Sequence, residues 1–313
     1  MTHSPLHCVT GAFGYTGKSI SEQLIAKGMR VRTLTNSTNR HNPFADKLDI
    51  HQLAFHNQAH LIESLQGVQI LYNTYWVRFN HKLFTFEQAV ENTKTLFAAA
   101  KHAGVKKIVH VSILHADQAD DLGYYKGKHE LEDALKAIDI PYTIIRPAVL
   151  FGRGDILVNN IAWTLRRLPF FGTFGDGSYK IRPIHVDDMA ELMIQSAYES
   201  ESRTIDAVGP ESYTYKELVQ LIGSTVGISE PIISVHPMLG YLVSKLVNIA
   251  VNDVVITREE IKGLMRGLLD STTSSTGQTK LSDYIIHHKV TLGHKYANEI
   301  KRRTNRVASY EQI

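Results

Sequence analysis

The sequence has a single cysteine, and this scarcity excludes a fold that depends on disulfides. Cys8 is the sole cysteine of 313 residues and lies in a predicted strand, which is typical of a small core residue in a reducing compartment. Long apolar runs are missing as well. The most lipid-like stretch, 238–255, contains Lys245 and Asp253 and is therefore predicted to be an amphipathic helix and not a membrane span.

A large excess of charge of one sign is also lacking. The 34 lysines and arginines nearly balance 31 acidic residues, the net charge is +3, and the longest basic run is 301–303. This composition argues against nucleic-acid binding. Met1–Pro5 leads directly into the first predicted strand, so we expect no signal peptide. We expect a cytoplasmic protein without a transmembrane segment, and peripheral membrane contact through 238–255 stays open as an alternative.

A glycine-rich corner stands close to the N-terminus. A predicted strand, 6–10, is followed by Gly11-x-x-Gly14-x-x-Gly17 and then by a predicted helix, 18–27. Glycine is needed where the backbone turns tightly and approaches a ligand, because a Cβ would collide there. The helix start offers amide hydrogens and a partial positive charge to a pyrophosphate. Because a second strand follows within about thirty residues, this corner predicts a dinucleotide-binding unit.

Strands and helices then alternate along the chain. Further strands are predicted at 68–73, 107–112 and 141–145, and helices at 84–103 and 125–138. Such alternation indicates a parallel sheet with right-handed crossovers. We predict an α/β, doubly wound Rossmann fold, with residues 1–150 as the dinucleotide-binding domain. Residues 151–313 are expected to complete the sheet at about 181–210 and to form a small, mainly helical substrate lobe.

A tyrosine and a lysine at helical spacing are candidates for chemistry. Tyr124 and Lys128 are four residues apart near the start of a predicted helix, so they share one face. A nearby ammonium lowers the pKa of a phenol, which then can relay a proton while a hydride moves. Ser112 ends the preceding strand, at the edge where such sheets bind ligands, and its hydroxyl is a candidate for holding the substrate oxygen. Tyr125 is the alternative acid–base residue, and simple packing is the alternative for the pair.

These motifs follow the order of a known superfamily. The sequence resembles the short-chain dehydrogenase/reductase superfamily, in its extended and atypical branches, through Thr10-Gly11-x-x-Gly14-x-x-Gly17, His110-Val111-Ser112, Tyr124-x-x-x-Lys128, Ile145-Arg146-Pro147 and Pro183-Ile184-His185-Val186-Asp187-Asp188. It is most similar to the epimerase/dehydratase-like, NmrA-like and complex I accessory-subunit-like proteins. The resemblance implies that Tyr124 is the acid–base residue and that Lys128 bonds the nicotinamide ribose. The implied cofactor-binding set also includes Gly11, Phe13, Gly14, Tyr15, Gly17, Asn73 and Pro147.

Two stretches depart from the pattern of this superfamily. Residues 35–40, after the second strand, contain no carboxylate that could accept hydrogen bonds from the ribose hydroxyls. Asn36 and Arg40 suit a 2′-phosphate better, which favours NADP over NAD, although Arg40 can also be a solvated loop residue. After the fourth strand, Tyr75 and Trp76 stand where the superfamily usually has small residues. They either contact the substrate or pack in the core.

The sequence is consistent with two functions. The first is an NAD(P)(H)-dependent oxidoreductase or epimerase/dehydratase that acts at a carbonyl or hydroxyl carbon of a small molecule, with Ser112, Tyr124 and Lys128 as catalytic residues. The second is a non-catalytic NAD(P)-binding protein with a regulatory or assembly role. The 16 histidines show no metal-ligand spacing, so we expect no metal site. The chain is expected to be a monomer or a homodimer.

Overall fold

The computed structural model describes residues 4–310, which divide into two compact units. The first unit runs to Pro147 and also contains Met189–Asp206 and Arg306–Tyr310. The second contains Ala148–Asp188 and Ala207–Asn305. Every predicted site residue lies in the first unit.

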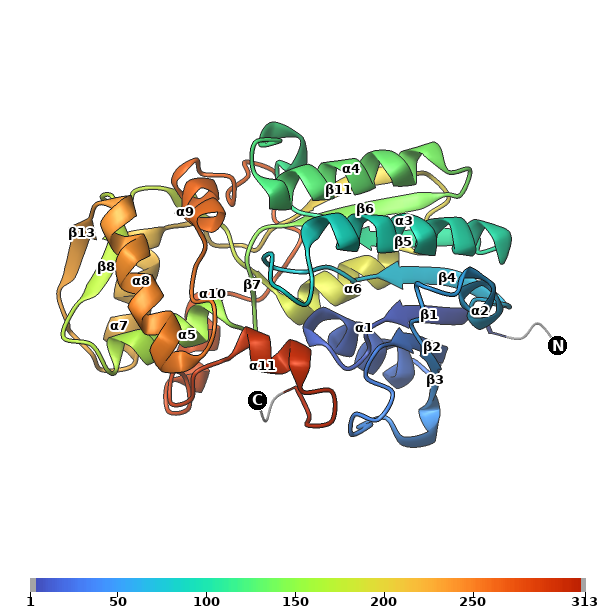
Figure 1. The fold of residues 1–313 in the computed structure, drawn as a ribbon. Coiled ribbons are helices and arrows are strands. Elements are labelled where there is room, and N and C mark those ends of the chain that lie inside the picture. The colour runs from blue at the N-terminus through green and yellow to red at the C-terminus, as the bar shows by residue number, and fades with distance from the viewer. Residues whose placement is uncertain (1–3, 311–313) are drawn as a thin grey trace. The chain divides into compact units, whose positions relative to one another are not determined.

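The first unit is built on a sheet of seven strands in the order β11-β6-β5-β4-β1-β2-β3 (Figure 1). The strands are β1 Leu6–Thr10, β2 Arg30–Thr35, β3 Leu48–Gln52, β4 Val68–Asn73, β5 Lys107–Val111, β6 Tyr142–Pro147 and β11 Arg203–Ala207. The ladders that join β6 through to β3 are parallel. This arrangement confirms the predicted doubly wound Rossmann fold. The carboxyl ends of β1, β4 and β5 meet at one edge, where such sheets bind their ligands.

Helices cover the sheet because their apolar stripes face it. They are α1 Tyr15–Ala26, α2 Gln58–Ser64, α3 Phe86–His102, α4 Gly123–Ala137 and α6 Val186–Ser196, with short 3₁₀ turns η1 Ala45–Lys47 and η2 Ala116–Gln118. Phe97 of α3 and Leu131 of α4 are buried in one cluster with Ile108 of β5. Helix α4 begins two residues earlier than the sequence predicts, so Tyr124 lies in its first turn.

The second unit is mainly helical. Its elements are β7 Leu150–Phe151, α5 Leu157–Leu165, β8 Phe171–Phe174, β9 Lys180–Ile181, β10 Ile184–His185, β12 Tyr213–Thr214, α7 Tyr215–Thr225, β13 Ile232–Val235, α8 Pro237–Val251, α9 Arg258–Met265, α10 Leu281–His288 and α11 Glu299–Thr304. The strands form small two-stranded sheets, such as β13 beside β8. Thr214 and Glu217 form a capping box that starts α7.

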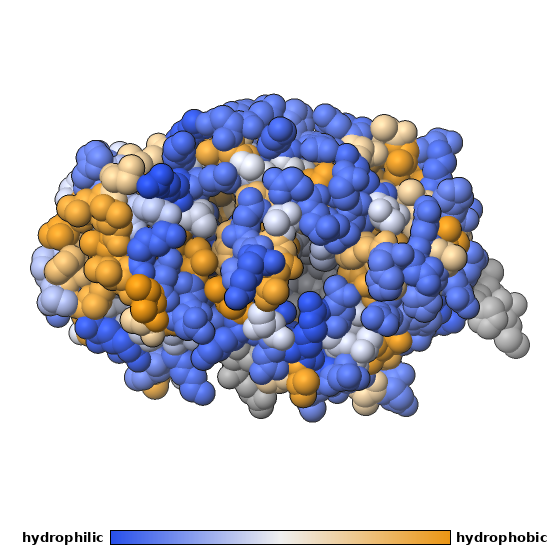
Figure 2. Space-filling view, viewed as in Figure 1, coloured by the Kyte–Doolittle hydropathy of each residue, from blue (hydrophilic) through white to orange (hydrophobic). Residues whose placement is uncertain are grey.

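Helix α8 carries an exposed aliphatic face. Figure 2 shows hydrophobic side chains gathered over the part of the second unit where Figure 1 labels α8, β8 and β13. On α8 the exposed large side chains are Met238, Leu239, Leu242, Val243, Leu246 and Ile249. None of the helices within residues 4–310 has the length and apolar character needed to cross a bilayer.

Candidate cofactor site and active site

The glycine corner has the geometry of a phosphate cradle. Gly11 has a φ of +72°, which favours glycine, and its amide donates to the Leu34 carbonyl. A Cβ on Gly17 would lie 2.3 Å from the Gly11 carbonyl oxygen, so only glycine lets α1 start this close to β1. Gly14 precedes the first helical residue, Tyr15, and the first turn contains no acidic side chain. The corner therefore presents a helix N-terminus to an anion, and the residues fit a dinucleotide pyrophosphate.

Arg40 lies beside this corner and not in solvent. It is 7% exposed, and its Nη1 donates to the Phe13 carbonyl over 3.4 Å. Phe13 itself is buried against Phe44. The solvated-loop alternative for Arg40 is therefore wrong. Asn36 is exposed in the same loop after β2, where a cofactor's ribose binds in this fold.

Tyr124 and Lys128 lie on α4 with Trp76 in contact with both. The Trp76 ring meets the Tyr124 ring edge-on at 5.6 Å and lies parallel to Phe86 at 5.9 Å. The Lys128 ammonium stands 4.5 Å from the centre of the same indole. A Cβ on Gly127 would lie 2.7 Å from the Trp76 ring, so this glycine makes room for the indole. Trp76 thus packs against the predicted catalytic pair.

The side chain of Lys128 is almost completely buried from solvent. Its side chain is 2% exposed, and Nζ donates to the Val111 carbonyl at the end of β5 over 2.7 Å. Burial lowers the pKa of Lys128 from 10.5 to about 7, and the negative charge of Glu132 opposes this shift. The ammonium therefore changes its charge near neutral pH, a property often found at functional sites.

The lowered pKa of Lys128 predicts a stability that depends on pH. Between pH 7 and 10.5 the unfolded chain binds more protons than the folded chain, so raising the pH stabilises the fold. We expect the unfolding free energy of the wild type, relative to a Lys128→Met variant, to rise by about 2 kcal/mol from pH 7 to pH 9. Urea denaturation of both proteins across this range measures it. A constant difference would contradict the burial-lowered pKa.

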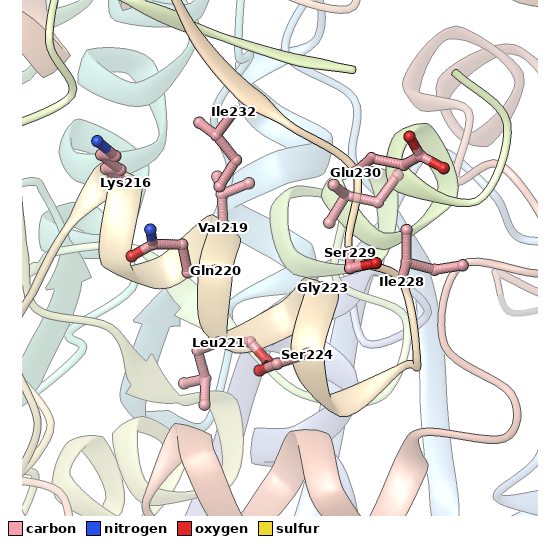
Figure 3. A pocket seen from close by; sticks show the side chains of 11 residues that line it. Lys216, Val219, Gln220, Leu221, Gly223, Ser224, Ile228, Ser229, Glu230 and Ile232 are labelled. Atoms are coloured by element: carbon pink, nitrogen blue, oxygen red, sulfur yellow. Dashed lines mark hydrogen bonds between the residues drawn. The ribbon is translucent and has the colours of Figure 1, made fainter. Parts of the chain in front are cut away.

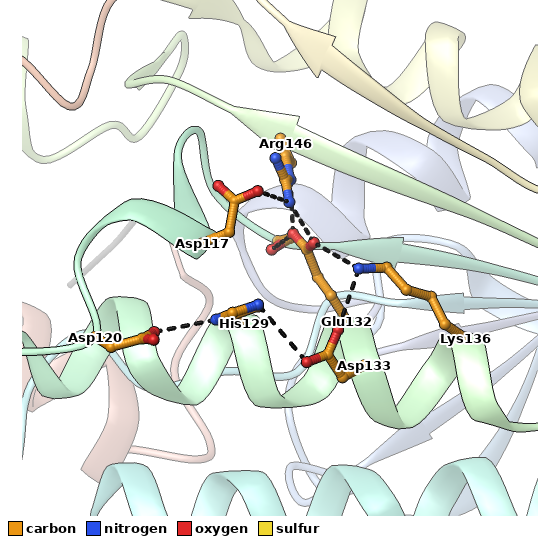
Figure 4. Close-up of polar contacts among 8 residues, drawn as sticks. Asp117, Asp120, His129, Glu132, Asp133, Lys136 and Arg146 are labelled. Atoms are coloured by element: carbon orange, nitrogen blue, oxygen red, sulfur yellow. Dashed lines mark hydrogen bonds and ion pairs between the residues drawn. The ribbon is translucent and has the colours of Figure 1, made fainter.

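The structure gives the Ser112 hydroxyl a partner other than substrate. Ser112 is 2% exposed, and its Oγ donates to the Glu132 carboxylate over 2.6 Å. Arg146 binds the same fully buried carboxylate through Nε at 2.8 Å and a second nitrogen at 2.5 Å, and also reaches Asp117 (Figure 4). The hydrogen bond to Glu132 raises the pKa of Arg146. Ser112 therefore belongs to a buried ion-pair network that joins α4 to β6, and its role toward substrate stays a prediction.

Asn73 also turns inward. It is fully buried, and its amide nitrogen donates to Nδ1 of His110 over 3.0 Å. Its amide oxygen accepts from the Thr10 hydroxyl and from the Tyr75 amide. Burial holds the pKa of His110 well below its ordinary value, so the imidazole is neutral. The Asn73 side chain thus ties together the ends of β1, β4 and β5, and its contact with a cofactor stays a prediction.

The other predicted residues surround this sheet edge. The Tyr75 hydroxyl accepts from Asn92 of α3 over 2.9 Å, and its ring lies 4.8 Å from Phe55, which favours the packing alternative. Pro147 is buried at the end of β6, where its carbonyl accepts from the Leu114 amide. A pocket of about 600 Å³ lies elsewhere, in the second unit, among side chains of α7 and the start of β13 such as Gln220 (Figure 3). None of its lining residues is a predicted site residue.

Sequence reasoning missed Glu132, although a simple pattern points to it. Glu132 follows Lys128 by four residues, so the helical spacing that joins Tyr124 to Lys128 continues one turn further. Its burial was not predictable, because its partners lie elsewhere in the chain, Ser112 directly after β5 and Arg146 in β6.

A comparison with known families decides the class of protein. The model of a family described as NAD(P)H-binding matches residues 11–197, more than half of the chain. The chain belongs to this NAD(P)H-binding family. The matched range includes the glycine corner, Arg40 and the Tyr124–Lys128 pair, so the predicted NAD(P)(H) cofactor is confirmed.

Individual relatives include a reductase and a subunit of a mitochondrial NADH-ubiquinone oxidoreductase. The chain is 25% identical over 68% of its length to the mitochondrial NADH-ubiquinone oxidoreductase 40 kDa subunit of Neurospora crassa, covering 58% of it. It is 23% identical to a ceramide reductase of Caulobacter vibrioides, over 70% of each chain. The fold resembles an NADPH-dependent quinone oxidoreductase of Escherichia coli, solved with NADPH, at a TM-score of 0.72 and 20% identity over 90% of this chain and 99% of that one. The match thus spans less than two thirds of the Neurospora relative.

Proposed function

We propose that the protein is an NADPH-dependent reductase of a lipid-soluble carbonyl compound, such as a quinone or a long-chain ketone. The observation that carries this proposal is the pairing of Tyr124 with the buried Lys128 on one face of α4, at the sheet edge beside the glycine corner. A protein that only binds a nucleotide has no need for a desolvated lysine next to a tyrosine. The names of two relatives, a ceramide reductase and a quinone oxidoreductase, support the substrate class.

Each residue has a definite role in this proposal. The amides of the Gly11–Gly17 corner hold the pyrophosphate, and Lys128 holds the nicotinamide ribose. When bound, NADPH supplies the hydride that the carbonyl carbon accepts. Tyr124 donates its proton to the carbonyl oxygen, so the carbonyl becomes a hydroxyl, and the proton of Tyr124 is then replaced from solvent. Glu132 and Arg146 fix the position of α4 through their ion pair.

NADPH consumption by the purified protein tests this function. Water-soluble quinones, alkyl quinones and long-chain ketones are offered in detergent, and the loss of NADPH absorbance is followed. We expect turnover with at least one apolar member of the panel and less with NADH. NADPH binding without turnover on any member would overturn the reductase proposal and support the non-catalytic alternative. That alternative is favoured by the Trp76 ring, which covers the Lys128 ammonium.

We further propose that α8 contacts an anionic membrane surface, where such substrates reside. Its exposed face is aliphatic, and its single charged residue is Lys245, which together with Arg258 of α9 flanks the Tyr241 ring at 5.1 and 4.7 Å. Aliphatic side chains beside cations and a tyrosine suit the boundary between acyl chains and anionic headgroups.

Vesicle flotation tests this membrane contact. We expect the protein to float with vesicles that contain phosphatidylserine, and a Leu246→Glu/Ile249→Glu variant to lose at least about 10-fold in binding, because both side chains would carry charge into the acyl region. Leu83→Glu is the matched control, since Leu83 is 63% exposed but lies in the first unit. Equal flotation of both variants, or self-association of the wild type without flotation, would contradict the proposal.

A further inference from the structure

The segment Arg306–Tyr310 belongs to the first unit although the chain before it belongs to the second. The His41 amide donates to the Val307 carbonyl over 3.3 Å, which fixes the segment beside the loop after β2. The Tyr310 ring is stacked on the Tyr15 ring, with centroids 6.3 Å apart and planes inclined by 22°. The segment thus contacts both parts of the cofactor site, the loop after β2 and the first residue of α1.

This contact brings two arginines together. Arg40 directly precedes His41 in the sequence, and Arg306 directly precedes Val307, so the His41–Val307 hydrogen bond brings the two arginines near each other. Arg40 is 7% exposed. Burial lowers the pKa of Arg40, the positive charge of Arg306 lowers it further, and Tyr310 opposes the shift, so Arg306 lies close enough to act on Arg40. Two like charges beside a buried position destabilise each other unless an anion lies between them.

The position of this pair suggests which anion it binds. The loop after β2 is where a Rossmann fold reads the 2′ position of the adenosine ribose. This loop contains hydroxyls, amides and Arg40 but no carboxylate. Arg40 also contacts the Phe13 carbonyl, inside the glycine corner that holds the neighbouring pyrophosphate. A phosphate on the 2′ oxygen would carry the charge that two guanidinium groups bind best.

We propose that Arg306, delivered by the C-terminal segment, forms with Arg40 a two-arginine site for the 2′-phosphate of NADPH. The stacking of Tyr310 on Tyr15 and the His41–Val307 hydrogen bond hold Arg306 in place. The segment therefore sets the preference for NADPH over NADH. This inference rests on the proposed use of NADPH, and it assigns that preference to a part of the chain remote in sequence from the nucleotide-binding motifs.

Calorimetric titration with nucleotide fragments tests the site without turnover. The probes are 2′,5′-ADP, which carries the 2′-phosphate, and 5′-ADP, which lacks it. We expect Arg306→Gln to weaken 2′,5′-ADP binding by about 10- to 100-fold, the loss expected for a charge-assisted hydrogen bond, and to leave 5′-ADP binding unchanged. Arg306 is exposed, so the variant should fold. Arg30→Gln is the matched control, because Arg30 is an exposed arginine at the opposite end of β2.

The outcomes separate this inference from the proposed reductase function. Equal losses for both nucleotides, or no loss for either, would overturn the role of Arg306. A wild type that binds 5′-ADP as tightly as 2′,5′-ADP would overturn the 2′-phosphate site as a whole. A wild type that discriminates between the nucleotides but reduces no carbonyl compound would leave the site standing and overturn the reductase.

Discussion

The Tyr124→Phe variant loses turnover by about 10²- to 10⁴-fold, the range typical for removal of a general acid, and keeps its affinity for NADPH. Phenylalanine retains the ring that meets Trp76 edge-on, so packing at the start of α4 is preserved. Only the hydroxyl that donates the proton is lost. Steady-state NADPH oxidation gives the turnover, and fluorescence titration gives the affinity. The expected result is therefore a fall in kcat with an unchanged dissociation constant.

Tyr125→Phe is the matched control for this experiment. Tyr125 is the next residue, is 6% exposed, and has a ring 5.8 Å from that of Tyr124. We expect this variant to retain turnover. If Tyr125→Phe loses activity and Tyr124→Phe does not, the acid–base role belongs to Tyr125. If both variants turn over like the wild type, neither phenol donates the proton.

The Gly17→Ala variant loses the phosphate cradle. Its Cβ would lie 2.3 Å from the Gly11 carbonyl oxygen and 3.0 Å from the Thr10 carbonyl oxygen. Neither backbone group yields easily, because Thr10 is part of β1 and the Gly11 amide is bonded to Leu34. We expect roughly 3 kcal/mol of lost stability from this overpacking. We also expect NADPH binding about 100-fold weaker, comparable to the loss of one or two charge-assisted hydrogen bonds.

Gly14→Ala provides a graded comparison. Its Cβ would lie 3.2 Å from the same Gly11 oxygen, a tight contact that a small backbone adjustment relieves. Urea denaturation and NADPH titration of both variants should therefore rank Gly17→Ala as the more damaged protein. The reverse order, or full affinity in Gly17→Ala, would show that the close approach of α1 to β1 does not shape the cofactor site.

The fold was predictable because its determinants are local and repeated. The ends of the first strand and the fourth are predicted as observed, since β1 is a short run between Pro5 and Gly11 and β4 directly follows Gly67. Helix starts were less accurate. Helix α1 begins at Tyr15 and α4 at Gly123, and neither helix has a side-chain cap hydrogen bond at its start. Such starts depend on tertiary packing and not on capping residues.

The site was predictable only where a sequence motif determines the backbone conformation. Gly11 shows the predicted tight turn through its φ of +72°, and Gly17 packs against the Gly11 carbonyl, because the geometry of glycine depends on its immediate neighbours. Ser112 and Asn73 were assigned to ligands but bond Glu132 and His110, partners that the fold alone brings near. The placement of Arg306 was not predictable for the same reason, since nothing in the local sequence shows that the segment returns to the first unit.

Deuterium transfer from NADPH most directly tests the central claim, that this site moves a hydride to a carbonyl carbon while Tyr124 supplies the proton. The wild type and Tyr124→Phe are incubated with NADPH deuterated at the reactive carbon and with a long-chain ketone. Mass spectrometry then locates the label in the product. We predict that the wild type places deuterium on the carbinol carbon. The variant is expected to transfer at least about 10²-fold less deuterium in the same time. Deuterium transfer of equal extent in both proteins, or tight NADPH binding by the wild type with no label in any ketone of the panel, would contradict the account.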